Sequence, residues 1–283
     1  MKYYEVQFTL SPSTPDANDL LMALAGEAGF EAFEETATGV AAYIQQQLFD
    51  AAATDAMIAG FPIGGVSISY TVGEAPDCDW NEQWEQEGFQ PIVIGSRLTI
   101  HDGRHLPEQP TPIMIEIDAR QAFGTGTHET TRLMCAELLA EGLEGKKALD
   151  CGSGTGILSI AALKLGASHC TAYDIDEWSA DNSRHNAVIN GVDERMTCLC
   201  GDASVTESLT ADYDVVMANI NRNILQADMA HFARVLKRGG TLLLSGFFRA
   251  DCSILEEAVA QHGLTVVHTT ADGEWACIKA VKR

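Results

Sequence analysis

Three glycines at alternate positions, Gly152, Gly154 and Gly156, separate the short apolar segment Ala148–Asp150 from an apolar helical stretch at 157–166. Glycine adopts positive φ without steric cost and lets the backbone come close to a ligand. A helix that begins directly after such a loop points its free N–H groups at the bound group. A strand, a glycine loop and a helix in this order predict a nucleotide cradle at the carboxyl ends of the strands.

The spacing of the glycines narrows the class of cofactor. Dinucleotide enzymes show Gly-x-Gly-x-x-Gly at this place, whereas this chain shows Gly-x-Gly-x-Gly, the form used by enzymes that bind S-adenosylmethionine (AdoMet). A tight turn uses the same residue type, so the neighbouring strands must supply further signals.

The next predicted strand, at 171–177, carries a carboxylate at its end. Asp174 lies 18 residues after Gly156, and an acid at this point can accept both hydrogen bonds of a ribose diol. The alternative role of a surface acid or helix N-cap suits Asp176 better. Because AdoMet and NAD both contain ribose, Asp174 alone does not separate the two cofactors.

Two further predicted strands end in polar residues. The strand at 196–201 leads to Asp202, where an acid and the adjacent backbone could read an adenine amino group. The strand at 213–220 places Asn219 at its carboxyl end. Parallel strands bring these ends to one edge of a sheet, so both side chains are expected over the same crevice.

The end of the chain predicts the fold class. Strands at 264–270 and 274–283 are joined by the short turn 271–273 and must pair antiparallel, because a parallel pair needs a long crossover. A Rossmann-like α/β fold whose mostly parallel sheet ends in such a hairpin is the layout of class I methyltransferases. A nicotinamide domain would continue with βαβ units instead.

The first 75 residues predict a separate α+β domain. The expected order is βαββαβ, the split-βαβ or ferredoxin-like arrangement. This part contains no glycine loop and no histidine, so recognition or positioning of a partner is its expected role, with stabilisation of its neighbour as the alternative. The expected strands are 3–10, 30–36, 39–45 and 66–72, and the expected helices are 16–28 and 49–59.

Between the two domains lies a segment that contains Trp80 and Trp84. On a helix these side chains share one face, which predicts either a packing seam or a hinge helix anchored by aromatics. The predicted organisation is a substrate-recognition domain at 1–75, a linker helix at 76–88 and a cofactor-binding domain at 89–283.

The negative charge is uneven. Of a net charge of −22, residues 1–96 hold 15 acids and a single base, Lys2. Such a surface repels nucleic acid, whose binders are basic, so no direct nucleic-acid binding is expected. It attracts a basic partner, although an acidic surface that serves solubility has the same composition.

Cysteine usage and hydropathy indicate a cytoplasmic protein without a membrane segment. The chain has no run of 18 apolar residues and no signal peptide. Its eight cysteines lack the Cys-x-x-Cys spacing of zinc or redox sites, and scattered thiols suit a reducing compartment. Cys151, inside the cofactor loop, is expected to be a small filler rather than a nucleophile.

Upstream of the glycine loop, His128 and Glu129 open a predicted helix. They could be taken for metal ligands or a base, but no His-Glu-x-x-His follows. No metal site is therefore predicted.

Five ordered motifs, FGTGTHETTRL, LDCGSGTGILSIAALKLGA, YDIDE, MANI and DWNEQW, together resemble the ribosomal protein L-11 methyltransferase (PrmA) family. The resemblance covers essentially the whole chain. It implies a ferredoxin-like substrate domain, a linker and a class I methyltransferase domain. It also implies AdoMet-dependent methylation of lysine ε-amino groups and the α-amino terminus of a basic ribosomal protein, L-11.

The resemblance also implies site residues. By this resemblance, the residues that contact AdoMet directly are Thr131, Gly152, Asp174 and Asn219. Those that line the pocket are Phe123, Gly124, Gly154 and Asp202. The chain departs from the family pattern at Cys151 and Ser153 inside the loop, and it diverges most in the first domain.

Methyl transfer from a sulfonium demands mainly positioning of the acceptor. Asn219 could accept an N–H of the amine and aim its lone pair at the methyl group, which makes it the candidate catalytic residue. Contact with the cofactor only is the alternative. No general base is evident, and bulk water is the expected proton acceptor.

Three functions fit these patterns: a protein-amine methyltransferase, a methyltransferase for another protein or small-molecule acceptor, and an AdoMet-binding module without turnover. Enzymes that methylate release-factor glutamine carry Asn-Pro-Pro-Tyr after the fourth strand. This chain has Asn219-Ile220-Asn221-Arg222 there, which argues against that acceptor. A monomer is expected.

Overall fold

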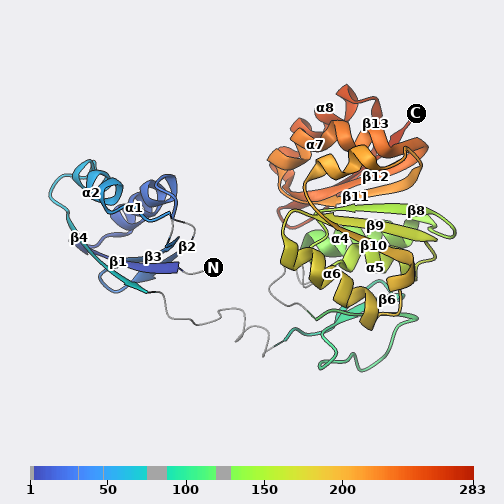
Figure 1. The fold of residues 1–283 in the computed structure, drawn as a ribbon, viewed down its shortest axis with the longest axis horizontal. Helices are drawn as coiled ribbons and strands as arrows, with labels where there is room; N and C mark the ends of the chain where they lie inside the picture. The colour runs from blue at the N-terminus through green and yellow to red at the C-terminus, as the bar shows by residue number, and fades with distance from the viewer. Residues whose placement is uncertain (1–2, 31, 47, 75–87, 119–128) are drawn as a thin grey trace. The chain divides into compact units, whose positions relative to one another are not determined.

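The computed structural model describes residues 3–30, 32–46, 48–74, 88–118 and 129–283. The chain divides into two compact units, Met1–Glu82 and Gln83–Arg283 (Figure 1). The predicted linker helix, with Trp80 and Trp84, lies outside the described residues except for Gly88.

The first unit has the predicted element order. Its four strands pair antiparallel in the order β2-β3-β1-β4, and both helices cover one face of the sheet (Figure 1). Thr14 caps α1 by accepting a 3.3 Å hydrogen bond from the amide of Ala17. The elements are β1 (Tyr3–Ser11), α1 (Pro15–Glu27), β2 (Ala32–Thr36), β3 (Gly39–Gln45), α2 (Ala51–Ala59) and β4 (Ser67–Glu74).

The second unit is built on a seven-stranded sheet of order β10-β9-β8-β11-β12-β14-β13. Strand β14 pairs antiparallel with both β12 and β13, and the other neighbours are parallel. The predicted fold class, a mostly parallel sheet that ends in an antiparallel hairpin, is confirmed. The strands are β8 (Lys147–Cys151), β9 (His169–Asp174), β10 (Met196–Cys200), β11 (Tyr213–Asn219), β12 (Leu236–Phe248), β13 (Leu264–Asp272) and β14 (Trp275–Lys282).

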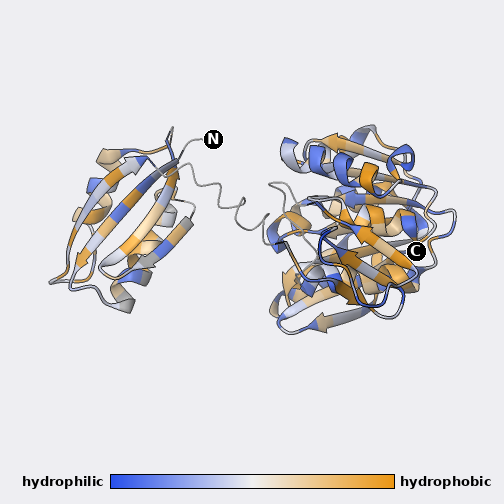
Figure 2. Ribbon diagram, turned by 90° about the horizontal axis from the view of Figure 1, so that it is seen from below, coloured by the Kyte–Doolittle hydropathy of each residue, from blue (hydrophilic) through white to orange (hydrophobic). Residues whose placement is uncertain are grey.

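Helices cover both faces of this sheet. One face carries α4 (Glu129–Glu141), α5 (Ile157–Lys164) and α6 (Glu177–Ile189), and the other carries α7 (Arg222–Val235) and α8 (Cys252–Gln261) (Figure 1). Each face has its own buried cluster, and the first unit has a third. Figure 2 shows hydrophobic residues along the strands of both sheets, where these clusters lie.

Two features of the second unit were not predicted. A three-stranded sheet forms from β5 (Ile92–Ile94), β6 (Leu98–His101) and β7 (Ile113–Glu116), whose apolar side chains join the core under α4 and α5. The run LKRGG at 236–240 is expected from its two glycines to form a turn before the next strand. It is instead the irregular start of β12, whose register against β11 shifts there.

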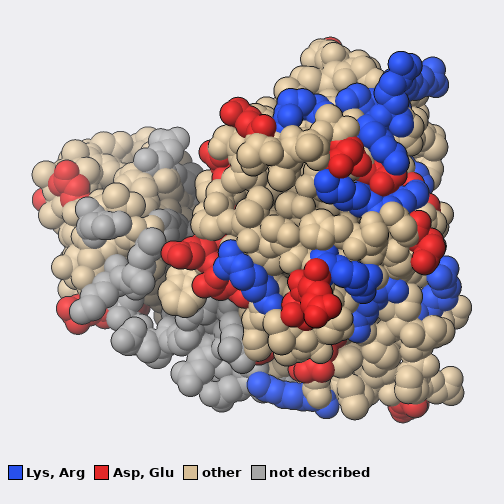
Figure 3. Space-filling view, turned by 45° about the vertical axis from the view of Figure 1, so that its right-hand side comes forward, with Lys and Arg blue, Asp and Glu red and all other residues tan. Residues whose placement is uncertain are grey.

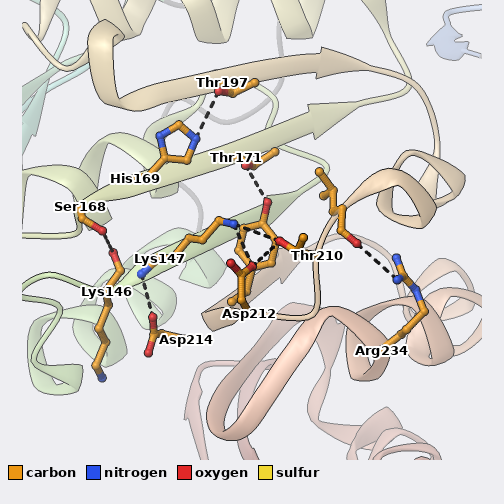
Figure 4. Close-up of polar contacts among 12 residues, drawn as sticks. Lys146, Lys147, Ser168, His169, Thr171, Thr197, Thr210, Asp212, Asp214 and Arg234 are labelled. Carbon is orange, nitrogen blue, oxygen red and sulfur yellow. Dashed lines mark hydrogen bonds and ion pairs between the residues drawn. The ribbon is translucent and has the colours of Figure 1, made fainter.

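Polar contacts fix the amino ends of the strands, opposite the predicted site (Figure 4). Lys147 Nζ lies 2.8 Å from Asp212 Oδ1, and its backbone N–H donates to Asp214 across 2.9 Å. The buried hydroxyl of Tyr213 donates to Thr171 Oγ1 across 2.8 Å. These bonds tie β8, β9 and β11 together at the edge that takes no part in the site.

On the face that Figure 3 shows, Lys and Arg side chains gather on the second unit, and the charged side chains visible on the first unit are acidic. This agrees with the uneven charge of the sequence. Among the described residues, no helix is long and apolar enough to cross a lipid bilayer.

Candidate active site

The glycine loop connects β8 to α5 as the sequence predicts. Gly152, Gly154 and Gly156 have φ values of 74°, 52° and 79°, which L side chains rarely adopt. The amides of Gly152 and Ser153 both donate to the carbonyl of Tyr173 in β9, across 2.9 and 3.0 Å. The loop is therefore anchored to the end of the neighbouring strand.

Asp174 follows Tyr173 at the end of β9, and its side chain also binds the loop. Its Oδ2 accepts a 2.8 Å hydrogen bond from the amide of Gly154, and its Oδ1 accepts a 3.0 Å bond from the amide of Asp176. Each carboxylate oxygen can accept a second bond, so the half-buried side chain keeps acceptor capacity for a ligand. Asp176 is the N-cap of α6, accepting from the Ser179 amide across 2.9 Å, which confirms its predicted role.

Asn219 lies at the carboxyl end of β11, beside the loop. Its Oδ1 is buried and has no hydrogen-bond partner within the described part of the chain. Its neighbour Ile220 reaches the loop, because a Cβ added to Gly152 would lie 2.4 Å from Ile220 Cγ2. A buried acceptor without a partner costs about 1–3 kcal/mol, and such an atom in a glycine-lined site is typical of a group that meets a ligand.

Asp150 is a second carboxylate at the site, fully buried, and the sequence reasoning missed it. Its Oδ2 accepts from the amide and the hydroxyl of Ser159 in the first turn of α5, across 3.1 and 2.7 Å. Its Oδ1 has no partner among the described residues. Burial raises the pKa of Asp150 to about 6, against the lowering effect of the Ser159 hydrogen bonds. An acid two positions before the first glycine was the signal available in the sequence.

The end of β10 continues the same edge of the sheet. The amide of Gly201 donates to the carbonyl of Asp174 across 2.8 Å, which places the following residue, Asp202, beside the end of β9. Asp202 caps a short 3-10 helix and accepts from the Ser204 amide across 2.9 Å. Hydrogen bonding from Ser204 lowers its pKa.

Two apolar side chains are exposed next to Asp174 and were not predicted as site residues. Ile175 is 77% exposed and Trp178 is 67% exposed. Ile175 follows directly on Asp174, and Trp178 lies in the first turn of α6, so this edge offers apolar surface beside its carboxylates. Their signal in the sequence was weak, because an isolated apolar residue after a strand is common.

The remaining predicted residues lie upstream. Thr131 is buried in the first turn of α4, and its neighbour Arg132 pairs with Asp272 at the end of β13 across 2.8 Å. Phe123, Gly124 and His128 lie outside the described residues.

The described residues show neither a cluster of metal ligands nor a reactive thiol at the site. It contains no group of three or more His, Cys, Asp or Glu side chains that could hold a metal ion. Burial raises the pKa of the Cys151 thiol well above its ordinary value, so this thiol stays protonated and fills space, as expected.

The site thus joins a glycine loop, the acid Asp174 at the end of β9 and the amide Asn219, with its buried Oδ1, at the end of β11. The family model described as ribosomal protein L11 methyltransferase (PrmA) matches residues 18–283. The chain belongs to this family.

Relatives of the PrmA family match the chain at full length. A ribosomal protein L11 methyltransferase of Bacteroides fragilis is 46% identical over 281 residues, 99% of this chain and 100% of the relative. One from Phocaeicola vulgatus is 44% identical over 283 residues and covers 100% of both chains. The sequence-based resemblance to the PrmA family is therefore confirmed.

A solved structure shows the same fold. The crystal structure of ribosomal protein L11 methylase from Lactobacillus delbrueckii subsp. bulgaricus superposes with a TM-score of 0.62 at 26% sequence identity. It covers 69% of this chain and 100% of its own. The PrmA family depends on AdoMet, so AdoMet is the cofactor to test against the glycine loop.

Proposed function

We propose that the protein transfers methyl groups from AdoMet to lysine ε-amino groups and the N-terminal α-amino group of ribosomal protein L11. Membership of the PrmA family and the names of its relatives support the reaction class and the acceptor. The observation that carries the proposal is the buried Oδ1 of Asn219 beside the glycine loop, which has no hydrogen-bond partner among the described residues.

The residues at the loop fit AdoMet. Gly152 and Gly154 leave room for close approach of a ligand to the backbone, and Asp174 retains acceptor capacity for the ribose hydroxyls. The Oδ1 of Asp150, to which no described residue donates a hydrogen bond, offers a negative charge to an ammonium group. We further assign Thr131 to direct contact with AdoMet, Asp202 to the adenine end, and Phe123 and Gly124 to the wall of the pocket.

When bound, AdoMet supplies an activated methyl group on a sulfonium. The protein must present a neutral amine to it, and the ordinary lysine pKa near 10.4 makes neutrality cost about 4–5 kcal/mol at pH 7. Desolvation of the amine lowers that pKa. Asn219 Oδ1 accepts an N–H of the neutral amine and so orients its lone pair, and the proton leaves to bulk water.

The first unit is proposed to present the acceptor. It has the ferredoxin-like strand order and the strongly acidic composition of residues 1–96, and it contains no element of the cofactor site. An acidic surface steers a basic protein toward the enzyme. We assign the protein to the cytoplasm, as a monomer that binds L11 without direct contact to nucleic acid.

Replacement of Asn219 tests the proposed chemistry. Asn219→Ala removes the acceptor that orients the amine, and misplaced reactants lose about 100-fold in rate, so kcat for L11 methylation should fall by about this factor. Asn221→Ala is the matched control. Asn221 is exposed and caps α7 by accepting from the Ile224 amide across 3.1 Å, so its loss should leave kcat near the wild-type value. Equal effects of the two variants would remove Asn219 from the reaction.

A further inference from the structure

Helix α6 presents a polar inner face to the glycine loop. Four of its side chains are buried although they are polar: Ser179, Asn182, Ser183 and Asn186. A buried polar side chain destabilises a fold unless it forms hydrogen bonds. The hydrogen-bond partners of these four side chains therefore indicate the role of this face of α6. Two of the four, Ser183 and Asn186, contact the loop itself.

Ser183 holds one carbonyl of the loop. Its hydroxyl donates to the carbonyl of Gly154 across 2.9 Å and lies 3.0 Å from the hydroxyl of Ser153. The contact is close, since a Cβ added to Gly156 would lie 3.0 Å from Ser183 Oγ. Gly156 therefore has no room for a side chain while α6 sits at this distance.

Asn186 holds the next carbonyl and also a second segment. Its Nδ2 donates to the carbonyl of Thr155 across 2.9 Å, and its Oδ1 accepts from the amide of Asp118, just after β7, across 3.0 Å. One fully buried amide thus joins the cofactor loop to the chain that follows β7.

Asn190, the C-cap residue of α6, makes the same kind of contact, and among the described residues no hydrogen bond joins its side chain to the loop. Its Oδ1 accepts from the amide of Glu116 across 3.0 Å, and its Nδ2 donates to the carbonyl of Glu116. The chain therefore supplies an internal comparison for Asn186.

Two successive carbonyls turned toward α6 fix the orientation of two successive peptides. In a trans peptide the C=O and the following N–H point in opposite directions. Holding the carbonyls of Gly154 and Thr155 toward α6 therefore turns the amides of Thr155 and Gly156 away from α6. A loop that already has its bound conformation loses no conformational entropy when the ligand binds, so the free energy of binding is more favourable.

We propose that Ser183 and Asn186 are positioning residues that preform the glycine loop for AdoMet. The inference rests on the proposed function for the identity of the cofactor. It adds that two side chains of α6 influence the affinity for the cofactor by holding the loop, and that Asn186 holds the segment after β7 to the loop.

The test is AdoMet affinity of the full chain, measured by calorimetry without an acceptor protein. Ser183→Ala removes one neutral hydrogen bond and adds no bulk, so the dissociation constant should rise roughly threefold to tenfold. Asn186→Ala should weaken binding at least as much. Asn190→Ala should lower the thermal unfolding midpoint but keep the dissociation constant within about twofold of wild type. In methylation assays, Ser183→Ala should raise KM for AdoMet and leave kcat at saturating AdoMet unchanged.

Unchanged AdoMet affinity in Ser183→Ala and Asn186→Ala would overturn the inference. Equal weakening in Asn190→Ala would also overturn it, because the effect would then come from general loosening of α6. If wild-type protein does not bind AdoMet, the proposed function itself fails, and the two failures are thereby distinguished.

Discussion

Gly152 and Ile220 lie so close that a Cβ on Gly152 would come within 2.4 Å of Ile220 Cγ2. This contact joins the glycine loop to the end of β11, where Asn219 stands. The clashing methyl belongs to a β-branched side chain with little rotamer freedom. Gly152→Ala should therefore displace Ile220 and Asn219 and lower AdoMet affinity by about tenfold or more, as measured by calorimetry.

Gly145 provides the control for this substitution. Its φ of 73° matches the 74° of Gly152, but a Cβ at Gly145 would meet nothing within 4 Å. Gly145→Ala carries the same backbone strain without the collision, so it should lower stability slightly and leave AdoMet affinity unchanged. Similar affinities in the two variants would show that the contact with Ile220 does not matter.

Asp174 should contribute to cofactor affinity in two ways, because it holds the amide of Gly154 and has acceptor capacity left for a ribose. Asp174→Ala should weaken AdoMet binding by roughly 1–3 kcal/mol. Asp176→Ala removes the N-cap of α6 and should cost stability by about 1 kcal/mol instead. If the loss of affinity follows Asp176, the ribose contact belongs there.

The raised pKa of Asp150 predicts how the free energy of unfolding should change with pH. Burial raises its pKa from 3.8 to about 6, so the folded state binds a proton more tightly than the unfolded state. The tighter binding of this proton stabilises the folded state. Its contribution to the free energy of unfolding is fully present below about pH 4 and is lost as the pH rises through about 6. Across that range, wild type should lose up to about 3 kcal/mol relative to Asp150→Asn.

Urea unfolding of both proteins at several pH values checks this prediction. The comparison must be made as a difference between the two, because carboxylates with lowered pKa, such as Asp102 at about 2, change stability in the opposite direction. A difference that does not vary with pH would mean that Asp150 is ionised throughout.

The sequence predicts the elements that follow strong local rules. The strand, glycine loop and helix at 148–166, the cap at Asp176 and the antiparallel hairpin at the end all appear where expected. These features depend on residues close together in the chain. Local rules failed at LKRGG, where the pairing of β12 with β11 extends the strand through glycines that favour a turn.

The parts of the site that sequence reasoning missed depend on contacts across the fold. Ser183 and Asn186 read as ordinary polar residues of a helix, and only the packing of α6 against the loop makes them buried partners of Gly154 and Thr155. Likewise, Asp150 gains its raised pKa from burial that no local pattern reveals.

We expect the second unit to bind AdoMet and the first unit to orient the acceptor protein. A fragment of residues 89–283 retains both buried clusters of the second unit and every residue assigned to the cofactor. It should bind AdoMet nearly as tightly as the full chain and fail to methylate L11, because orientation of the acceptor limits the reaction. Calorimetry establishes that the fragment is folded and competent. Methylation of L11 by the fragment at near-full efficiency would make the first unit a structural accessory.

Attraction between the acidic first unit and its acceptor should depend on salt. Screening shortens electrostatic interactions to about 8 Å at physiological ionic strength, so KM for L11 should rise with added salt while kcat changes little. Steady-state assays of the full chain at increasing salt measure this. A KM that does not respond to salt would remove electrostatic steering from the account.

The most direct measurement is the intact mass of unmethylated L11 after incubation with the full-length protein and AdoMet. We expect a rise by whole methyl groups, located by peptide mapping on lysine side chains and the N-terminal amine, and a rise about 100-fold slower with Asn219→Ala. An unchanged mass of L11, with AdoMet binding by the protein demonstrated in the same preparation, would contradict the proposed acceptor.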